Sequence, residues 1–148
     1  MKRFIHCICL VFLWIVFSNF QCSDDENWRH GEWRINNKTT ETLIIDISRT
    51  KGDLHSYRIE PDSTRSFMMA KLGMDIVFED LTCPYNVELA EAVVKSENGD
   101  FLKTWTYVQR EDAGRQFFAE KYWSHAILNS GRDFIWEFSI LPEDLPNQ

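Results

Sequence analysis

The pattern that most constrains the fold is a strict alternation of apolar and polar residues near the end of the chain. Large apolar side chains occupy every second position there: Phe134, Trp136, Phe138 and Ile140. Most of the residues between them are polar, with Ile135 as the exception. Successive side chains of a β-strand point to opposite faces of its sheet, so this period of two predicts a half-buried strand over residues 133–141.

The same alternation recurs in shorter segments that are separated by turn residues. After a first strand near Trp33, strands are predicted at residues 42–48, 55–59, 64–70, 75–79, 92–96, 101–108 and 122–128. Asn98-Gly99 tolerates the positive φ angles of a tight hairpin turn, and Pro142 stops the last strand. Short strands joined by turns about every ten residues predict an all-β fold, with seven or eight strands in an antiparallel, immunoglobulin-like β-sandwich. A closed barrel with a ligand cavity is the alternative.

One segment between the predicted hairpins has the features of a short helix. It covers residues 111–122, where Asp112 is a candidate N-cap and Phe118 and Tyr122 are four positions apart. Gly114 opposes a helix at this place.

The chain begins with the pattern of an export signal. Lys2 and Arg3 precede an apolar run over residues 4–17, interrupted by His6. This run is shorter than the roughly twenty residues that span a bilayer as a helix, so cleavage is expected. A retained membrane anchor extended by Phe20 is the alternative.

Cys22 is the predicted lipid attachment site, because a lipoprotein signal is cut just before a cysteine that receives diacylglycerol and palmitate-type acyl chains. Ser23, Asp24, Asp25 and Glu26 follow it, and with Cys22 they resemble the surface-export signal of lipoproteins in Bacteroidetes-type bacteria. The predicted organisation is a signal peptide over residues 1–21, an acidic tether over 22–31 and one domain over 32–148. An ordinary cut after Ser18 is the competing interpretation.

The cysteines separate these two interpretations. Cys7 and Cys9 leave with the signal, so a lipidated Cys22 leaves Cys83 without an intradomain disulfide partner. A freely secreted form could instead join Cys22 to Cys83.

The charge of the chain excludes several functions. Its 148 residues carry a formal net charge of −7. Loss of Lys2 and Arg3 with the signal would make it more negative. Such a surface argues against nucleic acid as a partner and against docking on anionic lipid head groups. The histidines lack the spacing of a zinc site, and no catalytic constellation is present, so we expect no metal, no cofactor and no enzymatic activity.

Several segments together resemble small surface lipoproteins of Bacteroidetes-type bacteria. They are Ile35-Asn36-Asn37, Leu43-Ile44-Ile45, Ile59-Glu60-Pro61, Lys103 to Tyr107, Gly114 to Phe118, Trp123 and Ile140 to Leu145, together with Cys22 to Glu26. The resemblance covers most of the chain. It implies a β-domain anchored by lipid in the outer membrane and exposed at the cell surface, and it transfers no catalytic residues.

The tryptophans divide into two groups. Trp105 and Trp136 lie on alternating strands and are expected in the core. Trp28 and Trp33 flank the tether and are expected to be exposed, as candidate contacts for a ligand. The sequence therefore predicts a non-enzymatic surface protein that binds or assembles with another surface component. A small carbohydrate-binding domain that uses exposed aromatic residues is the alternative.

Overall fold

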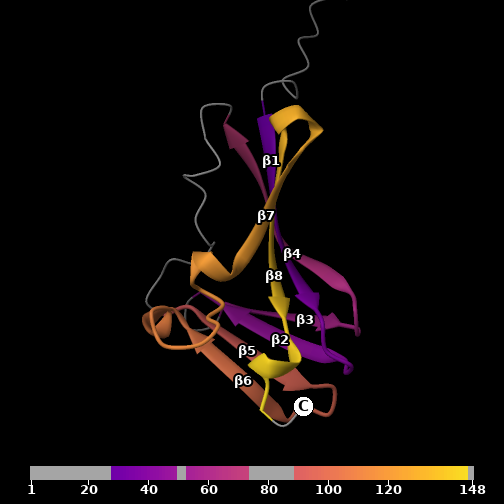
Figure 1. Ribbon diagram of the computed structural model, residues 1–148, viewed down its shortest axis with the longest axis vertical. Helices are drawn as coiled ribbons and strands as arrows, with labels where there is room; N and C mark the ends of the chain where they lie inside the picture. Colours follow the sequence, from indigo (N-terminus) through magenta and orange to yellow (C-terminus); the bar gives the residue numbers. More distant parts are fainter. Residues whose placement is uncertain (1–27, 50–52, 74–88, 147–148) are drawn as a thin grey trace, which may run out of the picture.

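The computed structural model describes residues 28–49, 53–73 and 89–146 of the chain. They form two facing sheets of four strands each (Figure 1). Sheet A has the order β4-β1-β8-β7, and sheet B has the order β3-β2-β5-β6. The strand bounds are β1 Trp28–Asn37, β2 Leu43–Ser48, β3 Leu54–Ile59, β4 Thr64–Gly73, β5 Glu91–Ser96, β6 Phe101–Thr106, β7 Trp123–Leu128 and β8 Asp133–Ile140. The predicted all-β sandwich is confirmed.

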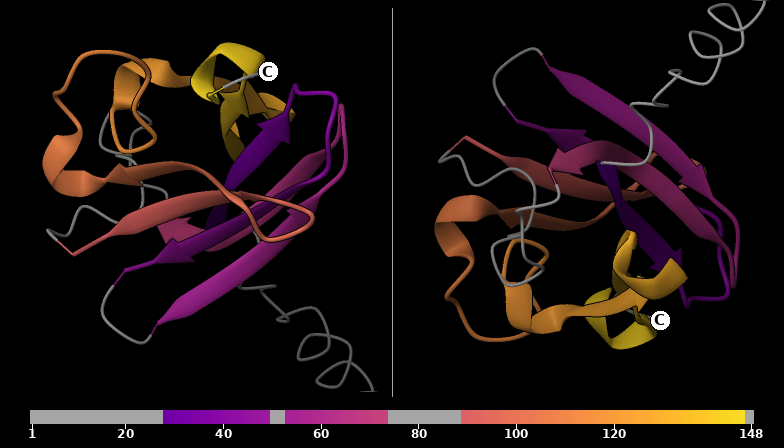
Figure 2. Two further views of the ribbon diagram at one scale, coloured as in Figure 1. Left: turned by 90° about the horizontal axis from the view of Figure 1, so that it is seen from below. Right: turned by 90° about the horizontal axis from the view of Figure 1, so that it is seen from above.

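The strand pairing departs from the expected arrangement at one place. β1 and β8, the first and last described strands, lie side by side in parallel at the centre of sheet A. The other pairs in the described part of the chain are antiparallel. Figures 1 and 2 show that the strands of the two sheets run in different directions, and that one end of sheet A extends beyond sheet B.

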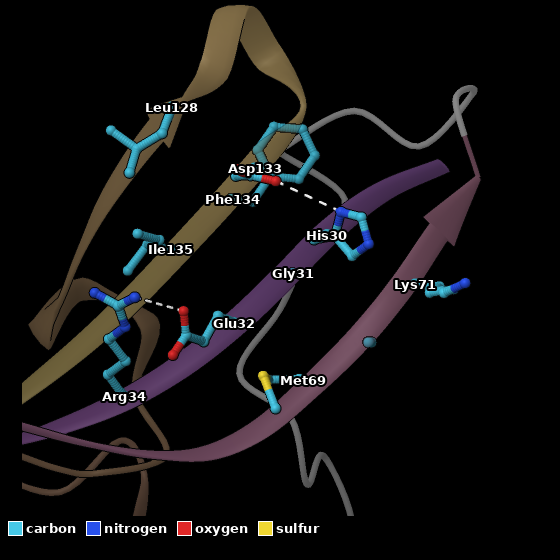
Figure 3. A pocket seen from close by; sticks show the side chains of 11 residues that line it. His30, Gly31, Glu32, Arg34, Met69, Lys71, Leu128, Asp133, Phe134 and Ile135 are labelled. Carbon is cyan, nitrogen blue, oxygen red and sulfur yellow. Dashed lines mark hydrogen bonds and ion pairs between the residues drawn. The ribbon is translucent and has the colours of Figure 1, made fainter. Parts of the chain in front are cut away.

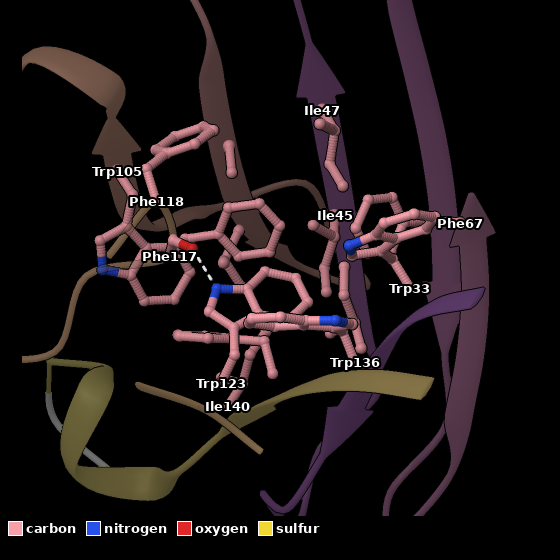
Figure 4. Close-up of a cluster of buried hydrophobic side chains, with 14 of the residues drawn as sticks. Trp33, Ile45, Ile47, Phe67, Trp105, Phe117, Phe118, Trp123, Trp136 and Ile140 are labelled. Atoms are coloured by element: carbon pink, nitrogen blue, oxygen red, sulfur yellow. Dashed lines mark hydrogen bonds between the residues drawn. The ribbon is translucent and has the colours of Figure 1, made fainter. Parts of the chain in front are cut away.

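The core lies between the sheets and is rich in aromatic side chains (Figure 4). Trp105 and Trp136 are 1% and 2% exposed, which confirms their expected burial. Phe117 packs against the rings of both Trp105 and Phe138, so side chains from the two sheets and from the connection between β6 and β7 meet there. Filled interiors of this kind are typical of a β-sandwich.

β1 begins at Trp28, within the stretch that the sequence assigned to the tether. Gly31, the last residue of the predicted tether, lies inside the strand. A Cβ atom there would come within 2.9 Å of the Trp33 ring and of Leu72 Cδ1. The glycine is therefore needed because the Trp33 indole packs directly against the backbone.

The expected helix over residues 111–122 is not formed. The described chain contains only short 3-10 helices: η3 Tyr107–Gln109, η4 Glu120–Tyr122, η5 Asn129–Gly131 and η6 Pro142–Asp144. Gly114 has a φ of 89°. Phe117 and Phe118, which are consecutive in the sequence, are both buried. A positive φ interrupts an α-helix, and two neighbouring residues do not share one helical face.

Several expectations lie outside the described residues. They are the signal over 1–21, lipid attachment at Cys22, the export residues 23–26 and the strand at 75–79. In the part that the structure describes, no helix is both long and apolar enough to cross a membrane.

Candidate functional site: a groove on the outer face of sheet A

The candidate site is built on the two central strands of sheet A. Along β1, Trp33 and Ile35 point into the core, so the alternating His30, Glu32 and Arg34 lie on the outer face. Along β8, the buried aromatic residues likewise leave Asp133 and Ile135 on the outer face. The parallel register places His30 beside Asp133 and Glu32 beside Ile135.

The outer side chains of β1 and β8 form the floor of a groove of about 440 Å³ (Figure 3). Met69 and Lys71 border it from β4, and Leu128 borders it from β7. Met69 is 77% exposed and Leu128 is 46% exposed, so both apolar side chains are accessible from solvent. The groove thus combines a polar floor with partly apolar borders.

Glu32 and Arg34 form the tightest ion pair of the groove. Arg34 Nη2 donates a hydrogen bond to Glu32 Oε2 at 2.5 Å, and both side chains are about one-third exposed or less. This hydrogen bond from Arg34 lowers the pKa of Glu32, and the same contact raises the pKa of Arg34. Both groups are therefore charged at neutral pH, and the pair presents fixed donors and acceptors.

Two further pairs continue the polar row. His30 Nδ1 lies 3.5 Å from Asp133 Oδ1 on one side of the Glu32–Arg34 pair. On the other side, Asn36 Nδ2 donates a hydrogen bond to Glu137 Oε1 at 2.9 Å. The outer face of the β1–β8 pair therefore carries a line of side chains that are already held in place by their neighbours.

The charges that line the groove balance one another. Arg34 and Lys71 contribute positive charge, and Glu32 and Asp133 contribute negative charge. Across the described residues, no group of at least three His, Cys, Asp or Glu side chains is arranged to hold a metal ion. The chemistry offered here is hydrogen bonding from paired charges, together with contact to apolar side chains.

The structure separates the two tryptophans that were expected near the tether. Trp28 is 42% exposed and shares the outer face with His30, two residues along β1. Trp33 is only 3% exposed, so its expected exposure was wrong. It occupies an inward position of β1 together with Ile35, and its ring packs over Gly31. Trp28 therefore remains a candidate ligand contact, whereas Trp33 belongs to the core.

Sequence reasoning missed the groove itself. The alternation of His30, Glu32 and Arg34 was available as a signal, since it continues the period of two at Trp33 and Ile35. Their neighbours come from β4, β7 and β8, which are distant in the sequence and are brought together only by the pairing of the strands.

The fold and the groove define an all-β sandwich with a polar groove on the outer face of one sheet. Comparison of the chain with known protein families, with curated proteins and with solved structures finds no match.

Proposed function

We propose that this chain is a non-enzymatic, lipid-anchored protein of the outer membrane surface, and that it recognises another surface component through the outer groove of sheet A. The observation that carries the recognition role is the groove, in which the Glu32–Arg34 ion pair and the His30–Asp133 contact lie between accessible apolar side chains. Prearranged polar groups in a concave site reduce the ordering cost of binding.

The anchoring role rests on the sequence of the amino-terminal segment. Cys22 follows an export-type apolar run and precedes a serine and three acidic residues. Only a few residues separate Cys22 from the start of β1 at Trp28. An extended chain spans at most about 3.5 Å per residue, so a lipid on Cys22 would hold the groove within a few nanometres of the membrane. The partner is therefore a membrane-proximal component.

Intact mass and membrane fractionation test the anchor. The native protein and a Cys22→Ala variant are produced in a Bacteroidetes-type host. We expect a lipid-sized mass increase and membrane retention in the native protein, and the loss of both in the variant. A soluble native protein that begins near Asn19 would contradict lipid anchoring.

Site-specific photocrosslinking on intact cells tests recognition. A photoreactive residue replaces Met69 at the groove in one variant and Leu54 on β3 in the control, because both side chains are largely exposed and apolar. Discrete adducts with a cell-surface component are expected from position 69 alone. Equal adduct patterns at the two positions would show that the groove has no special role.

A further inference from the structure

We infer that the ligand of the groove is a neutral glycan, whose hydroxyl groups bind the charged side chains of β1 and β8 and whose ring faces contact the apolar borders. This inference rests on the proposed recognition role of the groove and names the chemical class of the ligand. Three features of the groove lead to it.

The first feature is that the strands of the floor already have neighbours on both sides. β1 pairs with β4 and β8, and β8 pairs with β1 and β7. Their main-chain N–H and C=O groups are used in the sheet, so the floor cannot receive a peptide as an added strand. Recognition on this face has to come from side chains.

The second feature is the charge balance of the lining. Glu32 and Asp133 would repel a polyanion, whereas Arg34 and Lys71 would repel a polycation. The net charge of −7 on the whole chain further opposes an anionic ligand. The surface is therefore suited to a neutral ligand that carries many polar groups.

The third feature is the mixture of hydrogen-bonding partners. Each hydroxyl of a glycan both donates and accepts, so neighbouring hydroxyls can donate to the Glu32 carboxylate and accept from the Arg34 guanidinium, which are already paired at 2.5 Å. Met69 and Leu128 supply apolar contact for the C–H groups of the ring. Trp28 lies on the same face beyond His30 and offers an exposed aromatic surface.

The test uses the full-length mature protein, with its lipid, purified in detergent. Neutral hexasaccharides (maltohexaose, cellohexaose, xylohexaose and mannohexaose) are titrated separately at millimolar concentrations, with an oligogalacturonate as the anionic comparator and a chitosan hexamer as the cationic one. Amide chemical shifts from nuclear magnetic resonance report the position of binding. We expect at least one neutral hexasaccharide to shift the amides of residues 30–34 and 133–135.

Two arginine variants provide a matched comparison. Arg34→Met removes the groove guanidinium, whereas Arg58→Met removes a guanidinium on β3 that also contacts carboxylates, those of Glu60 and Glu97. Loss of a hydrogen bond to a charged group predicts about tenfold weaker binding for Arg34→Met and unchanged binding for Arg58→Met. Met69→Ala changes a largely exposed side chain, and a few-fold loss of affinity is expected from it without a loss of folding.

Other results would overturn the inference. They are the absence of groove shifts with every neutral hexasaccharide, binding of a charged comparator alone, and equal affinities of the native protein and a folded Met69→Ala or Arg34→Met variant. If the hexasaccharides fail while position 69 still gives groove-specific adducts, the ligand class is wrong and the proposed recognition role stands. If both experiments fail, both conclusions are wrong.

Discussion

Trp105 and Trp123 lie on different sheets, yet their indole N–H groups donate to carbonyl oxygens only two residues apart. Trp105 Nε1 donates to the carbonyl of Arg115 at 2.9 Å, and Trp123 Nε1 donates to that of Phe117 at 2.6 Å. The connection between β6 and β7 is therefore hydrogen-bonded to a tryptophan of each sheet. A buried indole with a partnered N–H contributes apolar contact and a hydrogen bond at the same site.

This relationship predicts different costs for two Trp→Phe substitutions. Trp105→Phe leaves the Arg115 carbonyl without its indole donor, whereas Trp33→Phe removes a buried indole N–H that has no hydrogen-bond partner among the described residues. The bond is partly buried, and a typical hydrogen bond contributes about 0.5–1.5 kcal/mol, so Trp105→Phe should lower the free energy of unfolding by that much more than Trp33→Phe does. Urea unfolding followed by circular dichroism measures both. Equal losses would show that the hydrogen bond of Trp105 contributes nothing.

The strands could be predicted because their signal is local. Alternation places Leu43, Ile45 and Ile47 on one face without any knowledge of the neighbouring strands, and this strand is found at Leu43–Ser48. The parallel pairing of β1 with β8 joins residues about a hundred positions apart and leaves no local pattern. The absence of a helix at residues 111–122 likewise depends on the packing of Phe117 between Trp105 of sheet B and Phe138 of sheet A.

Only part of the candidate site could be predicted from the sequence. The exposure of Trp28 was expected correctly, but Trp33 was also expected to be exposed because it lies next to the predicted tether over residues 22–31. The missing information was the close approach of the Trp33 ring to the backbone, which is a tertiary contact. The contact between His30 and Asp133 depends on the pairing of β1 with β8, which the sequence did not predict.

Asn37 is a buried polar residue that connects the end of β1 to the start of β2 and the end of β3. Its Nδ2 donates to the carbonyls of Glu41 and Ile59 at 2.8 and 3.0 Å. Its Oδ1 accepts from the backbone N–H and the hydroxyl of Thr39 at 3.0 and 2.8 Å. The side chain is 0% exposed, so these bonds replace all contact with water.

Asn37→Asp should therefore destabilise the fold strongly although it barely changes the volume of the side chain. The substitution removes the Asn37 Nδ2 donor from the carbonyls of Ile59 and Glu41, of which Glu41 keeps the Thr39 hydroxyl at 3.2 Å, and it buries a carboxylate beside them. We expect a loss of about 3–5 kcal/mol in the free energy of unfolding at pH 7, with partial recovery at acidic pH as the introduced carboxyl is protonated. Urea titrations at several pH values measure this. Asn98→Asp in the exposed β5–β6 turn is the control, and a similar loss there would contradict the explanation.

Stability should depend on pH through Asp46 on the outer face of sheet B. Burial raises the pKa of Asp46, but hydrogen bonds from Lys95 and Ser56 and the charge of Lys95 outweigh it, so the pKa is lowered in the folded protein. A lowered folded pKa adds stability that is complete above the ordinary aspartate pKa of about 4. This stability is lost as the pH falls through the folded value.

Lys95→Met tests this dependence. Lys95 Nζ lies 2.6 Å from Asp46 Oδ2, and the side chains are 27% and 9% exposed. We expect a loss of about 1–2 kcal/mol in the free energy of unfolding at pH 7, and a smaller loss below about pH 4, where the aspartate of the unfolded chain is protonated before Asp46 of the folded protein. Lys38→Met removes the longer, exposed pair with Asp62 and should cost less than about 0.5 kcal/mol. A Lys95→Met effect that stays constant from pH 7 to pH 3 would exclude the ionic origin.

Gly31 and Trp33 provide a test of the contact that shapes the floor of the groove. A Cβ at position 31 would lie 2.9 and 3.0 Å from two atoms of the Trp33 ring, so Gly31→Ala should cost about 1–3 kcal/mol through overpacking. Trp33→Phe removes the outer part of that ring and with it these two contacts. The remaining close contact is to a methyl group of Leu72, which can move because it lies at the end of a flexible side chain. We therefore expect the cost of Gly31→Ala to fall by at least half in a Trp33→Phe background, when urea unfolding of the single and double variants is compared in a double-mutant cycle. If Gly31→Ala costs the same in both backgrounds, the close approach of the indole is not the reason for glycine at this position.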